Sequence, residues 1–194
     1  MKQFIRYILS LPTRGYNWFL LKKNHVNCGK NLCIQGRLWC VSNSKDGIRL
    51  GENVKINSCF KSNPIGGSSR TVLFAKGNGK IRIGNRVGIS NACFFACDCI
   101  TVGDDVFIGG DVRIYDSDFH WLDAKRRTRE TGGESRPITI KDRAFIGAGS
   151  FILKGITIGE ESIIGAGSVV TKSVPDGEIW AGNPAKFIRK VTEE

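Results

Sequence analysis

The stretch ITIKDRAFIGAGSFILKGITIGEESIIGAGSVVTKSVP, residues 138–175, carries an apolar residue at every sixth position. The six positions that share this spacing are Ile140, Ile146, Ile152, Ile158, Ile164 and Val170. Because 41% of the chain is hydrophobic, six successes in one phase arise by chance roughly once in two hundred trials. The stretch is therefore a hexapeptide repeat, and it decides the fold.

A period of six matches neither the 3.6-residue period of a helix nor the simple alternation of a strand. It is typical of short extended segments joined by regular corners, three of which close one triangular coil. A single coil is too thin to bury its apolar residues, so neighbouring coils must stack them into a continuous core. The pattern predicts an all-β fold, a parallel β-helix.

The same spacing continues upstream with interruptions. It runs through Ile83, Ile89 and Phe95 and, after a slip of one residue, through Val102, Ile108 and Ile114. A weaker run, with a miss at Ser44, comprises Val26, Leu32, Leu38, Leu50 and Ile56. We therefore predict that the β-helix spans residues 26–175, with excursions at about 57–80 and 115–137.

The two ends of the chain lack this spacing. Residues 1–25 mix apolar and basic side chains, and we expect two short helices that form an N-terminal cap over the open end of the β-helix. Attachment to a membrane surface is an alternative role for this segment. Residues 176–194 form a C-terminal tail whose basic residues, Lys186, Arg189 and Lys190, lie close together.

Composition narrows the cellular setting and the partners. The 194 residues fit one domain, and no stretch is long and apolar enough to span a bilayer. The N-terminus lacks the features of a secretory signal, so we predict a cytoplasmic protein, with peripheral contact at the inner membrane surface as a further option. A net charge of +11 favours phosphates, anionic saccharides or an anionic membrane. A nucleic-acid partner is not expected, because no recognition pattern accompanies the charge.

The cysteines argue against disulfides and metal. Seven cysteines without a secretory signal are typical of reduced thiols. Cys93, Cys97 and Cys99 lie close together, but no second ligand pair of suitable spacing follows, so we predict no metal site. A γ-class carbonic anhydrase is disfavoured as well, because its zinc takes three histidines and this chain has two.

The repeat breaks between Ile114 and Ile140, where the chain is polar and charged. Long excursions from a repeat fold gather on the binding surface. His120 stands at the root of this excursion, and the only other histidine, His25, precedes the periodic region. His120 is therefore the main candidate for a general base, and nearby carboxylates could orient it.

The hexads, the segment YDSDFH at 115–120 and the ending VVTKSVPDGEIWAGNPAKFIRK at 169–190 together resemble the hexapeptide-repeat acyltransferases, above all the maltose, galactoside and polysaccharide O-acetyltransferases. The resemblance implies a left-handed β-helix, a homotrimer with active sites between neighbouring prisms, and acetyl-CoA as co-substrate. It implies that His120 removes the proton of an acceptor hydroxyl during direct transfer, with no acyl-enzyme.

The resemblance also assigns binding residues. On the acceptor side it points to Asn91, and to Glu134 as the carboxylate that supports the histidine. The residues that it implies for coenzyme binding are Ala148, Ala166, Thr171, Lys172, Lys186 and Arg189. The chain departs from the family at Phe145, where sugar acetyltransferases of this group often carry Trp.

We therefore expect an acetyl-CoA-dependent O-acetyltransferase that acts on a saccharide or nucleotide-sugar hydroxyl, with cell-surface polysaccharide biosynthesis as its setting. The arginine-rich part of the excursion, Lys125, Arg126, Arg127 and Arg129, suggests an acidic acceptor. Two alternatives stay open. One is N-acylation of an amino sugar or drug inactivation by acetylation, and the other is a β-helix scaffold without enzymatic activity.

Overall fold

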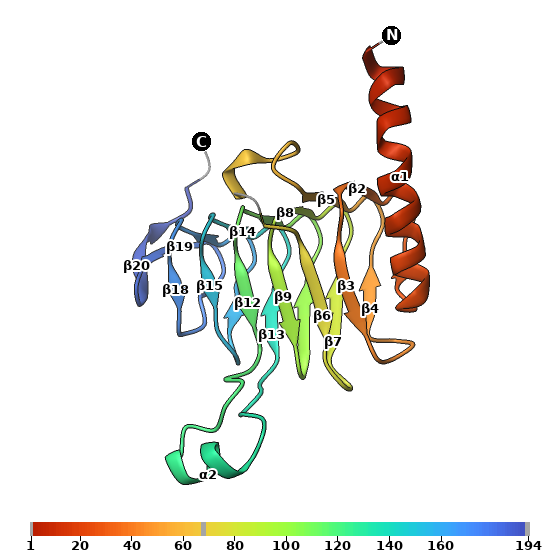
Figure 1. Ribbon diagram of the computed structural model, residues 1–194. Coiled ribbons are helices and arrows are strands. Elements are labelled where there is room, and N and C mark those ends of the chain that lie inside the picture. Colours follow the sequence, from red (N-terminus) through yellow and green to blue (C-terminus); the bar gives the residue numbers. More distant parts are fainter. Residues whose placement is uncertain (1, 67–68, 193–194) are drawn as a thin grey trace.

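The computed structural model describes residues 2–66 and 69–192, with side chains from residue 11 onward. Short strands wind through three sheets, and successive turns of the chain stack side by side along one axis (Figure 1). Neighbouring strands are parallel, apart from one C-terminal hairpin. The predicted left-handed parallel β-helix is confirmed.

The three faces of the prism are three sheets, called A, B and C in the order in which the chain visits them. Sheet A contains β1 (Asn27–Cys28), β4 (Ile48–Leu50), β7 (Lys80–Ile83), β10 (Cys99–Val102), β13 (Ile138–Ile140) and β16 (Thr157–Ile158). Sheet B contains β2 (Cys33–Gly36), β5 (Lys55–Ser58), β8 (Gly88–Ser90), β11 (Phe107–Ile108), β14 (Phe145–Ile146), β17 (Ile163–Ile164), β19 (Glu178–Gly182) and β20 (Ala185–Lys190). Sheet C contains β3 (Trp39–Ser42), β6 (Val72–Ala75), β9 (Cys93–Ala96), β12 (Arg113–Tyr115), β15 (Phe151–Ile152) and β18 (Val169–Val170).

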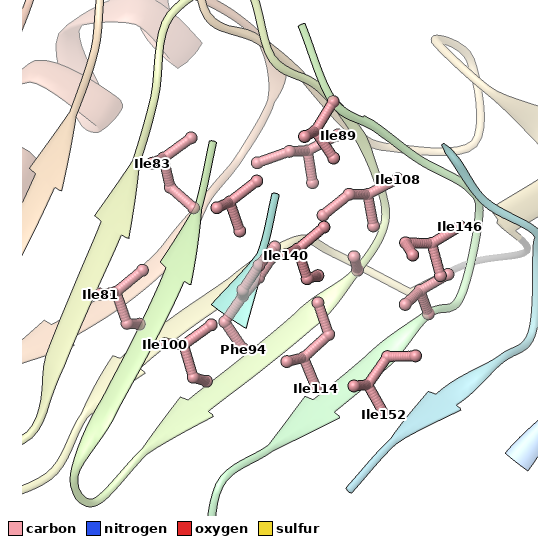
Figure 2. Close-up of a cluster of buried hydrophobic side chains, with 14 of the residues drawn as sticks. Ile81, Ile83, Ile89, Phe94, Ile100, Ile108, Ile114, Ile140, Ile146 and Ile152 are labelled. Carbon is pink, nitrogen blue, oxygen red and sulfur yellow. The ribbon is translucent and has the colours of Figure 1, made fainter. Parts of the chain in front are cut away.

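The hexad residues form the core. Ile140 pairs with Ile158 in sheet A, Ile146 with Ile164 in sheet B and Ile152 with Val170 in sheet C, and all six side chains are fully buried. Figure 2 shows the equivalent side chains of several coils pointing into the interior of the prism. Stacking in register therefore buries apolar surface that one coil would expose.

The predicted position of the phase slip was wrong. Phe94, not Phe95, is the inward residue of β9: it is fully buried and pairs with Ile114 of the next coil. Phe95 faces outward, where its ring stacks on Phe74 with centroids 4.9 Å apart. The slip occurs at the corner before β9, where Asn91 adopts a left-handed backbone conformation with φ of 48°, so the chain turns one residue early.

The predicted excursion at 57–80 was too long. Val72–Ala75 forms strand β6 of sheet C, which pairs with β3 and β9 and buries Leu73 completely. The described part of the departure lies within residues 59–71 and includes the 3₁₀ helix η1, Pro64–Gly66. The second excursion, between β12 and β13, lies where it was predicted.

One continuous helix, α1 (Lys2–Lys23), replaces the two short helices that were expected. It runs through Pro12, a residue that usually ends or kinks a helix. The C-terminal half lies against the first coil: the Asn17 side chain donates to the Gly36 carbonyl at 2.8 Å and accepts from the Leu38 N–H at 3.0 Å. The other end extends beyond the prism (Figure 1). In the described part of the chain, no helix has the length and apolar character needed to cross a bilayer.

Candidate active site

The excursion after β12 is a loop with a narrow stem that projects from the corner between sheets C and A (Figure 1). The stem is held by backbone hydrogen bonds from Asp118 N–H to Glu134 C=O at 3.0 Å and from Arg136 N–H to Asp116 C=O at 2.9 Å. At its tip lies the short helix α2, Ala124–Arg129, which Asp123 caps by accepting from the Arg126 N–H.

His120 lies on this stem and is exposed. The backbone N–H of His120 donates to the Asp118 carbonyl at 2.7 Å, and His120 forms a β-bridge with Gly132 across the stem. The adjacent Gly133 packs so closely that a Cβ there would lie 2.8 Å from the His120 backbone nitrogen. The backbone of His120 is therefore fixed, while the imidazole stays accessible.

Asp116 anchors the stem in the prism. Its side chain is fully buried and accepts hydrogen bonds from the N–H groups of Cys97 at 2.7 Å and Asp98 at 2.8 Å. Burial raises the pKa of this carboxyl. Because its oxygens are engaged by the preceding coil, Asp116 fixes the point at which the chain leaves the prism.

Glu134, the carboxylate predicted to support the histidine, is engaged elsewhere. Its carboxylate lies 2.5 Å from the Lys154 ammonium and 2.6 Å from the Arg136 guanidinium. Lys154 also lies 3.0 Å from Asp118, so it joins the two sides of the stem. Hydrogen bonds from Lys154 and Arg136 lower the pKa of Glu134, and the one with Glu134 raises the pKa of Lys154. Sequence reasoning missed Lys154, because this residue follows β15 on the prism whereas its partners, Asp118 and Glu134, lie on the stem of the loop.

A second cluster follows His120 directly. The Arg126 guanidinium lies over the Trp121 ring, 3.3 Å from its centroid, and pairs with Glu130 at 2.7 Å. The Trp121 Nε1 atom is buried and has no hydrogen-bond partner among the described residues. Arg126 thus stacks on Trp121 within the loop although its side chain is 47% exposed. The three other basic residues of the predicted cluster, Lys125, Arg127 and Arg129, are exposed as well.

Asn91, the predicted acceptor residue, lies at the corner between sheets B and C and is 2% exposed. Its amide nitrogen donates to the Ser69 carbonyl at 2.5 Å, and a Cβ on Gly66 would touch its side chain. The described part of the 59–71 excursion therefore covers it. Contact between Asn91 and an acceptor would require this cover to move.

The predicted coenzyme residues occupy three places. Ala148 and Ala166 follow each other at the corner between sheets B and C, joined by a hydrogen bond from the Gly167 N–H to the Ala148 carbonyl at 2.8 Å. The small side chains leave the backbone of this corner accessible. Thr171 and Lys172 are exposed beyond β18, at the corner between sheets C and A. Lys186 and Arg189 are exposed on β20, at the C-terminal end of the prism.

One prism does not bring His120 and Ala148 together. They lie at opposite ends of the strands of sheet C: Ala148 at the corner with sheet B and His120 at the corner with sheet A. The chain from Ser150 to Lys154 crosses this face over about 13 Å, at roughly 3.3 Å per residue. The outer side of sheet C carries a row of aromatic rings in mutual contact. These are Phe74, Phe95, Phe119, Tyr115 and Phe151, with ring centroids 4.8–6.4 Å apart.

Comparisons with known proteins agree with this architecture. Residues 137–172 match the family model "Hexapeptide repeat of succinyl-transferase". Nodulation protein L of Rhizobium leguminosarum is 49% identical over 108 residues, which is 55% of each chain. The chain spans about half the length of four curated relatives it matches. It also matches γ carbonic anhydrases 1 and 2 of Arabidopsis thaliana, at 41% and 45% identity over 58 residues, which is 21% of each relative.

Two solved structures extend the match to nearly the whole chain. The hexapeptide-repeat acetyltransferase VCA0836 of Vibrio cholerae, in complex with acetyl coenzyme A, is 25% identical with a TM-score of 0.60, covering 91% of this chain and 76% of that one. A maltose O-acetyltransferase of Clostridium difficile 630 is 25% identical with a TM-score of 0.61, covering 93% and 83%. These comparisons confirm the resemblance of the chain to the hexapeptide-repeat acyltransferases.

Proposed function

We propose that the protein is an acetyl-CoA-dependent O-acetyltransferase that acts on a saccharide hydroxyl, with His120 as general base. One observation carries the proposal: an exposed histidine, its backbone fixed by Gly133, stands where the repeat is interrupted. The prism around it matches that of an acetyltransferase solved with acetyl coenzyme A. An accessible imidazole suits proton removal near neutral pH.

The proposed reaction is a direct transfer. His120 takes the proton of the acceptor hydroxyl while the oxygen attacks the thioester carbonyl, and backbone N–H groups at a coil corner stabilise the oxyanion. The C–S bond then breaks, the proton held by His120 passes to the leaving thiolate so that the coenzyme departs as its thiol, and the acetyl ester remains on the acceptor. The small side chains of Ala148 and Ala166 would admit the pantetheine arm along their corner. Thr171, Lys172, Lys186 and Arg189 are the polar and basic groups proposed to contact the coenzyme.

A homotrimer would complete this site. His120 and the Ala148 corner lie at opposite edges of sheet C, so packing sheet C of three copies around a threefold axis would bring the loop of one copy to the Ala148 corner of the next. The aromatic row on sheet C supplies apolar surface for such an interface. Sheet A instead exposes polar groups, including Arg49, Thr139 and Thr157.

The acceptor is proposed to be an acidic saccharide or a nucleotide-linked sugar. Lys125, Arg127 and Arg129 present exposed charge at the tip of the loop that carries His120. Arg126, by contrast, is stacked on Trp121 and is proposed to support the loop rather than to bind. A basic protein with this chemistry fits cell-surface polysaccharide biosynthesis, in the cytoplasm or at the inner surface of the membrane.

The test is acetyl-CoA consumption, followed as thiol release, against neutral sugars, amino sugars, nucleotide sugars and acidic polysaccharide fragments. We expect release with a hydroxyl acceptor, product with an acetyl ester, and loss of release in His120→Ala. Acetylation of amino sugars only would favour N-acyl transfer. Absence of both turnover and coenzyme binding would favour a scaffold and would overturn the proposal.

The acidic-acceptor proposal has its own test. The triple variant Lys125→Glu, Arg127→Glu, Arg129→Glu should raise the KM for an acidic acceptor while acetyl-CoA binding stays unchanged. An equal triple reversal on another surface, at Lys30, Lys55 and Lys76, is the matched control. An unchanged acceptor KM in the loop variant would refute the assignment.

A further inference from the structure

Helix α1 turns an apolar surface toward solvent. Leu11, Trp18 and Phe19 are 46%, 64% and 61% exposed. The opposite side faces the first coil through the buried Asn17 and Asn24, with Leu20 and Leu21 packed against the core. A helix at a protein surface normally shows polar residues to water, so this arrangement indicates that another phase or molecule covers the outer side.

The charges of the helix are of one sign. Residues 2–23 contain five basic residues, namely Lys2, Arg6, Arg14, Lys22 and Lys23, and no acidic ones. The exposed Lys22 and Lys23 lie in the last turn, next to Trp18 and Phe19. Aromatic side chains flanked by lysines are typical of helices that lie in a membrane interface.

A hollow beside the helix extends the basic surface. It is lined by Thr13 of α1, by Arg37 at the end of the first sheet-B strand, and by Cys59 and Arg70 of the 59–71 excursion. Arg37 also lies over the ring of Tyr16, 5.3 Å from its centroid. Two guanidinium groups near a helix with exposed aromatic rings suit the phosphate of a lipid headgroup.

We propose that α1 is a membrane-docking helix that lies on an anionic bilayer, with Trp18 and Phe19 at the headgroup level and Lys22 and Lys23 toward lipid phosphates. The inference deepens the proposed location at the inner membrane surface and does not depend on acetyl transfer. A second copy of the chain is disfavoured as the occupant, because helix-to-helix packing would place like charges together.

The experiment is sedimentation of the 194-residue protein with phosphatidylcholine vesicles that contain or lack phosphatidylglycerol, without acceptor or acetyl-CoA. Wild type should bind the anionic vesicles, and binding should weaken with salt. Trp18→Ala with Phe19→Ala, and separately Lys22→Glu with Lys23→Glu, should each reduce binding by about tenfold or more.

The controls are matched in chemistry and placed away from α1. Phe187→Ala with Ile188→Ala removes two exposed apolar side chains from β20, and Lys76→Glu with Lys80→Glu reverses two exposed charges. Both should bind like wild type. Thermal unfolding of each variant checks that the prism is intact, and its molar mass in solution is measured in parallel.

Three results would overturn the proposal. The first is no binding of wild type to anionic vesicles, or equal binding to neutral ones. The second is unchanged binding in both α1 variants. The third is a change in molar mass in the α1 variants, which would make the outer face of the helix an interface between copies. Each can occur whether or not the protein transfers acetyl groups.

Discussion

The coils at 138–174 and the loop at 116–137 are adjacent in the chain but are held together in different ways. In the coils, each inward residue repeats the role of the residue one coil earlier, as Ile146 and Ile164 do. In the loop, three unlike contacts hold the stem: the buried Asp116, the close approach of Gly133 and the ion pairs of Lys154. The repeated coils supply stability, whereas the candidate base, His120, lies in the loop where the repeat is interrupted.

The strongest test of this contrast is His120→Ala. We expect acetyl transfer to fall by about 10²–10⁴-fold, the usual loss on removal of a general base. Because His120 is exposed, the free energy of unfolding should change by less than about 0.5 kcal/mol. Thiol-release kinetics and chemical denaturation measure the two quantities. Full turnover in the variant would show that His120 does not take part in the reaction.

Ile146→Ala tests the other side of the contrast. The side chain is fully buried between two coils, so its truncation should lower the free energy of unfolding by about 2–5 kcal/mol. Leu32→Ala, at a partly buried position in the first coil, should have a smaller effect. Denaturation at one fixed protomer concentration compares them. Equal losses would mean that the first coil is as well packed as the coil that contains Ile146.

Gly133→Ala sharpens the comparison by disturbing the loop alone. Its Cβ would meet the His120 backbone at 2.8 Å, and we expect kcat to fall by about tenfold to a hundredfold through misplacement of the imidazole. The control is Gly88→Ala, whose new methyl group meets only the Phe107 ring, at 3.0 Å. Acetyl-CoA binding should persist in both. A kcat equal to wild type would show that Gly133 does not position the histidine.

Lys154→Met should have the smallest effect. We expect hydrogen exchange at the Asp118 amide to rise by only about twofold to tenfold, because ion pairs that keep contact with water, here with Lys154 17% and Asp118 25% exposed, contribute modestly. Lys141→Met, which unpairs Asp176 at another corner, is the control. An unchanged exchange rate would mean that the pairs do not hold the stem.

The same ion pairs predict a pH dependence. Since the pKa of Glu134 is lowered in the fold, its contribution is present at neutral pH and is lost as pH falls through that lowered pKa. The raised pKa of Lys154 keeps its contribution until the pH rises through it. Exchange at Asp118, divided by the intrinsic amide exchange rate at each pH, should therefore increase at acid pH in wild type and less so in Lys154→Met.

The regular coils could be predicted from sequence because a hexad is a local signal. Each inward residue can be recognised from its spacing alone, as in the series from Ile140 to Val170. The slip near Phe94 was misplaced because an early turn at Asn91 shortens one interval and lengthens the next. The strand Val72–Ala75 was missed for a related reason: the long 59–71 excursion before it interrupts the period.

The site could be predicted only in part. His120 could be proposed as the candidate base because histidines are scarce and because it lies near the start of the interruption, both of which are visible in the sequence. The positions of Gly133 and Lys154 depend on which residues the stem brings together, and no spacing encodes that pairing. The cover over Asn91 was likewise invisible, since it depends on the path of the 59–71 excursion.

The central claim, that one copy supplies His120 and its neighbour supplies the Ala148 corner, is tested by complementation. His120→Ala and Ala148→Trp are each expected to be inactive alone. Co-expressed in equal amounts and purified as mixed trimers, they should regain about a third of wild-type activity, because in every mixed trimer one interface in three combines two intact halves. Mixed assemblies that stay inactive would contradict the account and place the whole site within one chain.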